Sequence, residues 1–147
     1  MTIEGGCRCG AVRYTLALED LPLTYACHCT DCQTWSGSAF SQQAIVPEDA
    51  IEASGPITIF ELTSPSGRLS RQRMCAVCHT RIFNTNSARP GVAVIRAGTL
   101  DRSNELVVTV HIWVKSKQPW FDLPEGVPAW PEAAPPEDMA KALGYAR

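Results

Sequence analysis

Seven cysteines in short, closely spaced groups are the residues of this sequence with the clearest chemistry. Three of them lie in the segment CHCTDC, residues 27–32, where soft thiolates can converge on one metal ion without long-range folding. His28 is the nearest candidate for a fourth ligand. If the segment leaves a strand, however, its side chain points away from the side shared by Cys27 and Cys29. Together with Cys32 these thiols predict a three-ligand site with a vacant position, which distinguishes a catalytic zinc from a structural one.

The other four cysteines form two pairs, Cys7 with Cys9 and Cys75 with Cys78. Together the two pairs can close one tetrahedral four-thiolate site that ties the start of the sequence to its middle. Spacing leaves a second partition open. In it, one metal is held by Cys27, Cys29, Cys75 and Cys78, and the open site by Cys7, Cys9 and Cys32.

Composition restricts the function classes. The 147 residues suit one domain, and a net charge of -2 gives no basic field for a nucleic-acid partner. The first residues resemble no secretory signal, and no apolar run is long enough to cross a bilayer, so we expect a cytoplasmic protein without membrane contact. In the reducing cytosol clustered thiolates bind metal rather than form disulfides, and the Cys-x-Cys pairs do not match common iron-sulfur spacings.

Short alternating segments must position these thiols. Val12, Tyr14 and Leu16 alternate with polar residues, which predicts a half-buried strand, and residues 23–27 form a second strand that delivers the open site. Thr30 is expected to cap a brief helix ended by Gly37.

A strand is predicted over residues 39–46, with Phe40, Ala44 and Val46 inward and Ser41 and Gln43 outward. Further short strands are expected at 57–62, 69–74, 81–84, 92–97 and 106–114, each bounded by glycine, proline, serine or asparagine. Their density, without a long helical period, predicts an all-β fold of barrel or sandwich-like architecture.

The segment from residue 106 to Lys115 shows the clearest alternation. Valine and isoleucine side chains predict a core face, which leaves His111, Trp113 and Lys115 on the other face. From Pro119 the chain becomes rich in proline and tryptophan and is expected to wrap the surface before a short helix over residues 137–143.

The stretch between Glu61 and Asp101 contains six arginines and no carboxylate. Solvated strand faces explain this pattern; the functional alternative is a wall that faces a ligand with carboxylates.

Three thiolates leave a divalent zinc net negative, so it is a weak activator of water. Binding a further thiol suits it better, because a zinc-coordinated thiol loses its proton at neutral pH and can then attack a small aldehyde. The competing interpretation is a purely structural site that takes Asp31, His79 or His111 as its fourth ligand.

These motifs resemble the glutathione-dependent formaldehyde-activating enzymes, grouped with the centromere protein V type domain, over residues 5–128. The resemblance is carried by GGCRCGAVRY, CHCTDCQTWSGSAF, SGRLSRQRMCAVCHTRIF, GTLD and HIWVKSKQPW. It implies an all-β, β-tent fold of short antiparallel strands that are held together by two zinc ions per chain, with a proline-rich C-terminal tail. The structural ligands would be Cys7, Cys9, Cys75 and Cys78, and the catalytic ones Cys27, Cys29 and Cys32.

The resemblance also implies a carbon-sulfur lyase that interconverts glutathione plus formaldehyde with S-hydroxymethylglutathione. Ser36, Gly37, His111 and Trp113 are the candidate substrate-binding residues, and glutathione is the expected partner. Two positions depart from the family: His79 replaces a glycine, and Gln33 replaces an arginine that is frequent in relatives. A non-catalytic zinc module that binds a thiol or a protein partner remains the alternative. We expect a zinc-binding domain over residues 1–130 and a C-terminal tail over residues 131–147.

Overall fold

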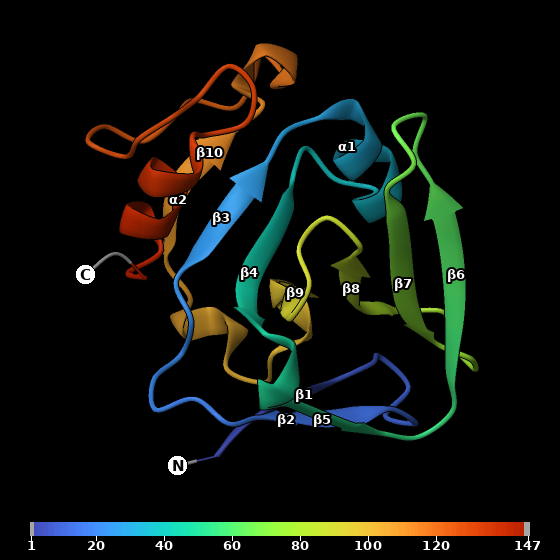
Figure 1. Ribbon diagram of the computed structural model, residues 1–147. Helices are drawn as coiled ribbons and strands as arrows, with labels where there is room; N and C mark the ends of the chain where they lie inside the picture. Colours follow the sequence, from blue (N-terminus) through green and yellow to red (C-terminus); the bar gives the residue numbers. More distant parts are fainter. Residues whose placement is uncertain (1, 146–147) are drawn as a thin grey trace. The chain divides into compact units, whose positions relative to one another are not determined.

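The computed structural model describes residues 2–145 and consists mostly of β-strands, with two short α-helices (Figure 1). The expectation of many short strands is therefore confirmed. The chain forms two compact units. One contains the chain up to residue 22 together with residues 44–105, and the other contains residues 23–43 and the chain from residue 106 onward.

The first unit contains a three-stranded antiparallel sheet in the order β1 (Ile3–Gly6), β2 (Arg13–Leu16) and β5 (Ile51–Ser54). Val12, Tyr14 and Leu16 are buried, as their alternation predicted. A Cβ atom at Gly5 would lie 2.4 Å from the ring of Tyr14 and 2.6 Å from the carbonyl oxygen of Thr99. This close approach requires glycine in the strand that leads to the first cysteine pair.

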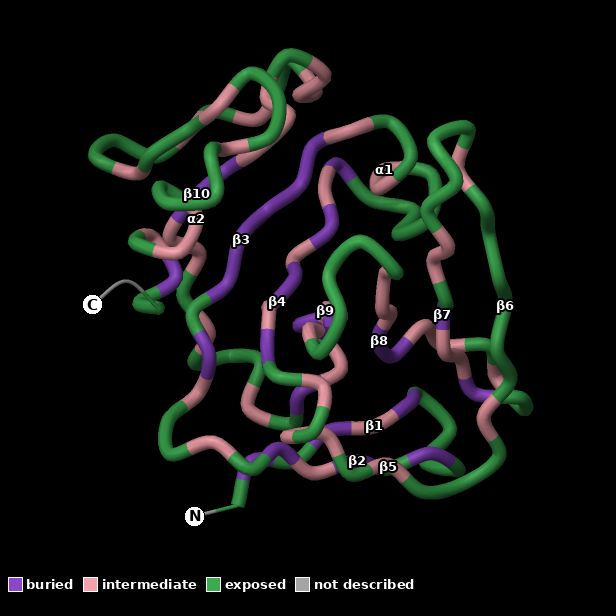
Figure 2. The backbone as a smooth tube through the Cα atoms, in the orientation of Figure 1, coloured by how far each residue is buried: buried purple, intermediate pink, exposed green. Residues whose placement is uncertain are grey.

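The same unit contains an antiparallel ladder of β6 (Ile57–Thr63), β7 (Leu69–Cys75), β8 (Arg81–Asn86) and β9 (Val92–Arg96). β6 is exposed along most of its length, whereas Ile82 and Ile95 are fully buried (Figure 2). Cys75 is the last residue of β7, so the ladder positions the second cysteine pair directly at its end. Three 3-10 turns accompany these strands, at Glu48–Ala50, Ala97–Thr99 and Ser103–Glu105.

The second unit is organised around β3 (Thr24–Cys27), which is buried at all four residues (Figure 2). β4 (Ser41–Pro47), whose first three residues belong to this unit, pairs with it antiparallel, and β10 (Val108–Ile112) pairs with it parallel. The expectation of antiparallel strands throughout is therefore wrong for β10. β10 is far from β3 in the sequence, so the chain returns by a long connection that allows the parallel direction, which a hairpin does not.

Ser41 and Gln43 were predicted to point outward, but both are buried. They lie opposite Cys27 and Tyr25 in the β3–β4 ladder, and directly opposite residues share one side of a sheet. Polar side chains are retained there because they face thiols and a hydroxyl rather than a purely apolar core. The prediction that Ala44 and Val46 lie inward is confirmed.

β10 ends earlier than its alternation predicted, because Trp113 adopts a left-handed backbone conformation with φ of 58°. His111 was placed on the polar face of this strand, yet it is 3% exposed. Backbone hydrogen bonds join His111 to Pro128 and Trp130 of the proline-rich segment, which covers this edge of β10.

Helix α1 (Thr30–Ser36) is capped by Cys29 rather than by Thr30, because the Sγ of Cys29 accepts the Cys32 backbone N–H. Gly37 ends it with φ of 63°, as expected. A 3-10 turn at Val114–Ser116 follows β10, and the expected C-terminal helix is α2 (Pro136–Ala142). Within residues 2–145, neither helix is long and apolar enough to pass through a membrane.

Candidate metal centres

Two groups of cysteines assemble in the structure, one in each unit. In the first unit the ligand atoms of Cys7, Cys9, Cys75 and Cys78 all lie within 4.8 Å of one another. The sulfurs of Cys7 and Cys9 are 3.5 Å apart, and those of Cys9 and Cys75 are 3.8 Å apart. Zinc-sulfur bonds of about 2.3 Å in a tetrahedron require sulfur separations of about 3.8 Å. The four thiols therefore fit one tetrahedral zinc ion.

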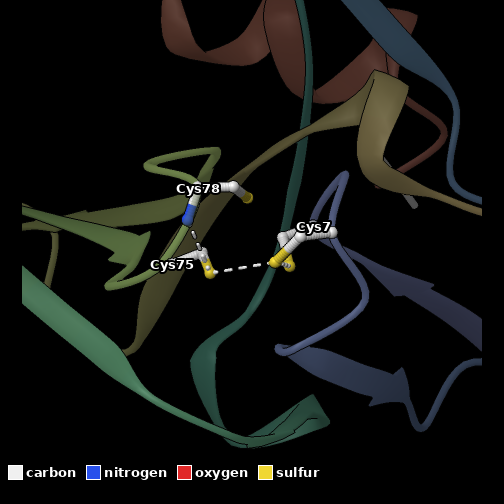
Figure 3. A group of neighbouring side chains, drawn as sticks. Cys7, Cys75 and Cys78 are labelled. Carbon is white, nitrogen blue, oxygen red and sulfur yellow. Dashed lines mark hydrogen bonds between the residues drawn. The ribbon is translucent and has the colours of Figure 1, made fainter.

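Backbone N–H groups point at these sulfurs. Val12 donates to the Sγ of Cys7 at 3.2 Å, and the N–H groups of Val77 and Cys78 donate to the Sγ of Cys75 at 3.3 and 3.4 Å. Figure 3 shows Cys7, from the loop after β1, next to Cys75 at the end of β7 and Cys78 in the turn that follows. Such donors orient thiolate ligands and stabilise their negative charge.

His79 closes this turn with φ of 63°, in the left-handed region that favours glycine. Histidine is one of the residues that tolerates this conformation, which is how the chain keeps the turn without a glycine. The Thr80 hydroxyl lies 3.1 Å from the Sγ of Cys78, and this contact lowers the pKa of Cys78 to about 5. Cys78 is thus prepared to bind metal as a thiolate at neutral pH.

In the second unit, Cys27 ends β3, Cys29 caps α1, and Cys32 lies in the first turn of that helix. Their three sulfurs lie within 4.8 Å of one another. Cys27 is buried, whereas Cys29 and Cys32 are only half-buried, so the group has an accessible side. The structure therefore brings the seven cysteines together as four plus three, and the alternative partition is wrong.

None of the three residues expected as a possible fourth ligand joins the three cysteines. Asp31 and His111 share the unit of the three cysteines, but neither joins the group, and His79 belongs to the other unit. Among residues 2–145, no imidazole or carboxylate lies with these three sulfurs at ligand spacing. The donor set of three thiols, with one exposed side, fits a zinc ion that has a position for an external ligand.

Without a metal, the thiols of Cys27 and Cys29 resist ionisation. The neighbouring Cys32 thiol and then burial raise the pKa of Cys27 far above that of a free cysteine, and burial raises the pKa of Cys29. Three adjacent negative charges in a half-buried pocket are unfavourable unless a cation neutralises them. A divalent ion reverses this preference, so metal binding must release protons from the group.

Gln43 is a residue of this site that the sequence did not reveal. Its Nε2 lies 3.6 Å from the Sγ of Cys32, and its Oε1 accepts a 2.5 Å hydrogen bond from the Tyr25 hydroxyl. Only the register of β3 and β4, which places Tyr25 opposite Gln43, brings these groups together. The result is an N–H donor directed at one of the three sulfurs.

His28 turns away from the thiols, as its place in the strand predicted. Its Nε2 lies 2.9 Å from the Nδ1 of His111, and the rings of Phe40 and Phe121 pack around the pair at centroid distances of 5.1 and 5.4 Å from His28. Burial and then His111 lower the pKa of His28 to about 4, and burial lowers the pKa of His111. The two imidazoles are therefore neutral at pH 7 and fix the loop that carries Cys27 and Cys29.

The four residues expected to bind substrate lie in different surroundings. Ser36 and Gly37 are at the end of α1, where Gly37 lines an open depression of about 420 Å³ together with Gln33, Ser38 and Gln118. His111 is buried against His28. Trp113 is half-buried, with the Lys115 ammonium 5.2 Å from its ring and its backbone N–H bonded to Glu132.

Gln33 holds the base of α1 in place. Its Nε2 donates to the carbonyl oxygens of His28 at 2.8 Å and Ser116 at 2.9 Å, and its Oε1 accepts a longer bond from Gln118 at 3.4 Å. Both amide hydrogens are thus used within the protein. At this position the side chain connects three segments of the second unit and has no charge to offer an anion.

Comparisons with known proteins found a family model and solved structures that match this chain. A family model described as glutathione-dependent formaldehyde-activating enzyme matches residues 2–116. A crystal structure of a Rhodobacter sphaeroides protein is similar in fold, with a TM-score of 0.54 and 16% sequence identity over 71% of this chain and 97% of that one. None of the curated proteins compared with this chain matches it.

Proposed function

Because the chain belongs to the glutathione-dependent formaldehyde-activating enzyme family, we propose that it is a zinc-dependent carbon-sulfur lyase. Its substrate would be the adduct of glutathione, or a similar thiol, with formaldehyde or another small carbonyl compound. The family supports a glutathione-related, formaldehyde-activating function. The observation that carries the proposal is the convergence of Cys27, Cys29 and Cys32 without a fourth ligating side chain among residues 2–145.

Zinc, when bound, supplies a coordination position at which an incoming thiol loses its proton at neutral pH. Three residues of the chain hold and orient the thiols around that position. The buried Cys27 anchors the group, Cys29 is fixed by its role as helix cap, and Gln43 directs an N–H at Cys32. In the overall reaction a carbon-sulfur bond forms between thiol and carbonyl carbon, and the thiol proton ends on the carbonyl oxygen. The reverse direction breaks that bond.

Ser36 and Gly37 are our candidates for contact with the ligand, because they lie at the end of the helix that carries Cys32, where Gly37 lines the depression. The assignment of His111 and Trp113 to substrate binding remains a prediction. The burial of His111 favours a positioning role, in which it supports His28 and through it the cysteine loop.

The same proposal includes two zinc ions per chain, the four-cysteine ion being structural, and a β-tent domain over residues 1–130 followed by a tail over residues 131–147. It also includes a cytoplasmic location, where glutathione is the principal small thiol. The fit of the four sulfurs to tetrahedral zinc and the burial of Cys7 and Cys75 support the structural assignment.

One observation favours a second candidate, a zinc module that binds a thiol or protein partner without turnover. Gln33 has no charge, its amide hydrogens are used by backbone carbonyls, and Lys117 donates to the carbonyl oxygens of Gln118 and Phe121. These side chains therefore have few hydrogen-bond donors left for the carboxylates of glutathione. Weak binding of glutathione would favour a binding module over an efficient glutathione-dependent enzyme.

Exchange spectroscopy by NMR on an equilibrium mixture of glutathione and formaldehyde distinguishes the two candidates. We expect zinc-loaded protein to accelerate exchange between free and adduct signals, and the Cys32→Ser variant to lose the acceleration while remaining folded. Exchange at the uncatalysed rate with saturating substrate would remove the enzyme proposal and leave the binding module.

A further inference from the structure

An arginine-lined pocket in the first unit takes no part in the chemistry described above. Arg71, Arg73 and Arg89 line a pocket of about 280 Å³ with Glu48 and Asn86. They come from the stretch between Glu61 and Asp101, which has no carboxylate. We propose that this pocket binds the phosphate or carboxylate group of a small molecule.

Arg73 is the least exposed cation of the pocket and is held in one position. Its guanidinium stacks over the Phe83 ring at 4.9 Å, and its Nη1 donates to the Thr85 hydroxyl at 2.8 Å. The side chain is 16% exposed, and its nearest ion-pair partner, Glu48, lies at 3.9 Å. Burial lowers the pKa of Arg73, because the charge is only partly compensated. A guanidinium fixed in this way is preorganised to receive an oxyanion.

The other two arginines of the pocket, Arg71 and Arg89, differ in their ion pairs. Arg71 forms an ion pair with Glu61 at 3.1 Å on the exposed side of the ladder. Arg89 is exposed in the turn after β8, and within residues 2–145 its guanidinium has no carboxylate at ion-pair distance. The lining has three arginines and one carboxylate, that of Glu48, so the net charge of the pocket is positive. Arg73 and Arg89 provide most of this charge.

The chemistry of the lining indicates the ligand. Guanidinium groups present paired N–H donors that match the oxygens of phosphate and carboxylate, and Asn86 adds an amide to the lining. The volume of about 280 Å³ lies just below the range for small-molecule sites, about 300–1,000 Å³. It therefore suits an anionic group with a short organic substituent. Solvated strand faces alone do not account for a cation that is half-buried and held by an aromatic ring.

Titration of the zinc-loaded, full-length protein with inorganic phosphate, and separately with succinate, tests the proposal by amide NMR at ionic strength matched with sodium chloride. We expect saturable shifts at residues 85–89 with at least one of the two anions, and the anion that binds more tightly identifies the group. Arg73→Gln and Arg89→Gln should each weaken binding about tenfold, the loss of one charge-assisted hydrogen-bonding group.

Arg102→Gln is the matched control, because it removes the same charge from an arginine of this unit that pairs with Glu105 outside the pocket. It should change the affinity less than about twofold. Arg89 is exposed, so its variant tests the site even if replacing the half-buried Arg73 impairs folding. Shifts that fail to saturate with both anions, or equal weakening by Arg102→Gln, would overturn the proposal.

Discussion

The side-chain nitrogen of Gln43 lies 3.6 Å from the sulfur of Cys32, and its orientation is fixed because the amide oxygen accepts the Tyr25 hydroxyl. This contact joins β4 to the first turn of α1. It provides a donor to a sulfur that we assign as a metal ligand.

We therefore predict that Gln43→Leu lowers the zinc affinity of the three-cysteine site about 10–100-fold, the usual effect of losing a partner of a metal ligand. Competition with a chromophoric chelator measures this affinity. Gln42→Leu is the control, because its amide bonds to the Thr24 hydroxyl in the same ladder without touching a thiol. Unchanged affinity in the Gln43 variant would show that the donor has no influence on the metal.

Cys78→Ala should leave mostly insoluble protein. Structural zinc contributes about 10–16 kcal/mol in small domains, which equals or exceeds a typical total stability of about 5–15 kcal/mol. Cys29→Ala is the comparison: it should fold but lose thiol binding, because the three-cysteine site is assigned to function. Soluble yield and circular dichroism report the difference, and a soluble, folded Cys78→Ala protein would contradict the structural assignment.

Replacing His79 by glycine should stabilise the zinc-loaded protein. The left-handed conformation destabilises the folded state by about 1–2 kcal/mol for a non-glycine residue. Glycine avoids this cost, but its more flexible unfolded state offsets about 0.5–1 kcal/mol of the gain. We expect a net gain of up to about 1 kcal/mol in thermal unfolding, and a loss for the β-branched His79→Val. A less stable glycine variant would mean that the imidazole itself stabilises the turn.

The buried Tyr14 makes stability fall at alkaline pH. Its hydroxyl lies 2.7 Å from that of Thr99, and burial raises the pKa of Tyr14 to about 12. The unfolded chain, with a tyrosine pKa of about 10, loses the proton first. Stability from this group is therefore complete below about pH 10 and declines from there to pH 12. Tyr14→Phe should show a shallower decline in this window during denaturant unfolding, and an equal slope would contradict the assignment.

Local signals in the sequence predicted the strands, the short helix with Gly37 at its end, and the turning away of His28. They also predicted which residues carry metal-binding chemistry. Each of these depends on neighbours close in the sequence, such as the alternation of Val12, Tyr14 and Leu16 or the closeness of Cys29 to Cys32. The family resemblance then indicated the grouping of the seven thiols that spacing had left open, and the structure shows that grouping.

The errors share a different cause, which is pairing between distant segments. Gln43 and His111 were predicted to be solvent-exposed, because polar residues at alternate positions of a strand usually face water. Both are buried in the structure. Gln43 contacts Tyr25 and Cys32, and His111 contacts His28. The parallel direction of β10 and the left-handed Trp113 likewise follow from long-range packing that no local pattern encodes.

The central claim is that zinc held by Cys27, Cys29 and Cys32 keeps a position for an external thiol. Crystallography with anomalous scattering at the zinc edge, on freshly reduced protein with and without glutathione, tests it most directly. We predict an ion at these three sulfurs whose fourth ligand comes from solvent and is replaced by the glutathione sulfur. A protein side chain as the fourth ligand in both crystals, or no ion at these sulfurs, would contradict the account.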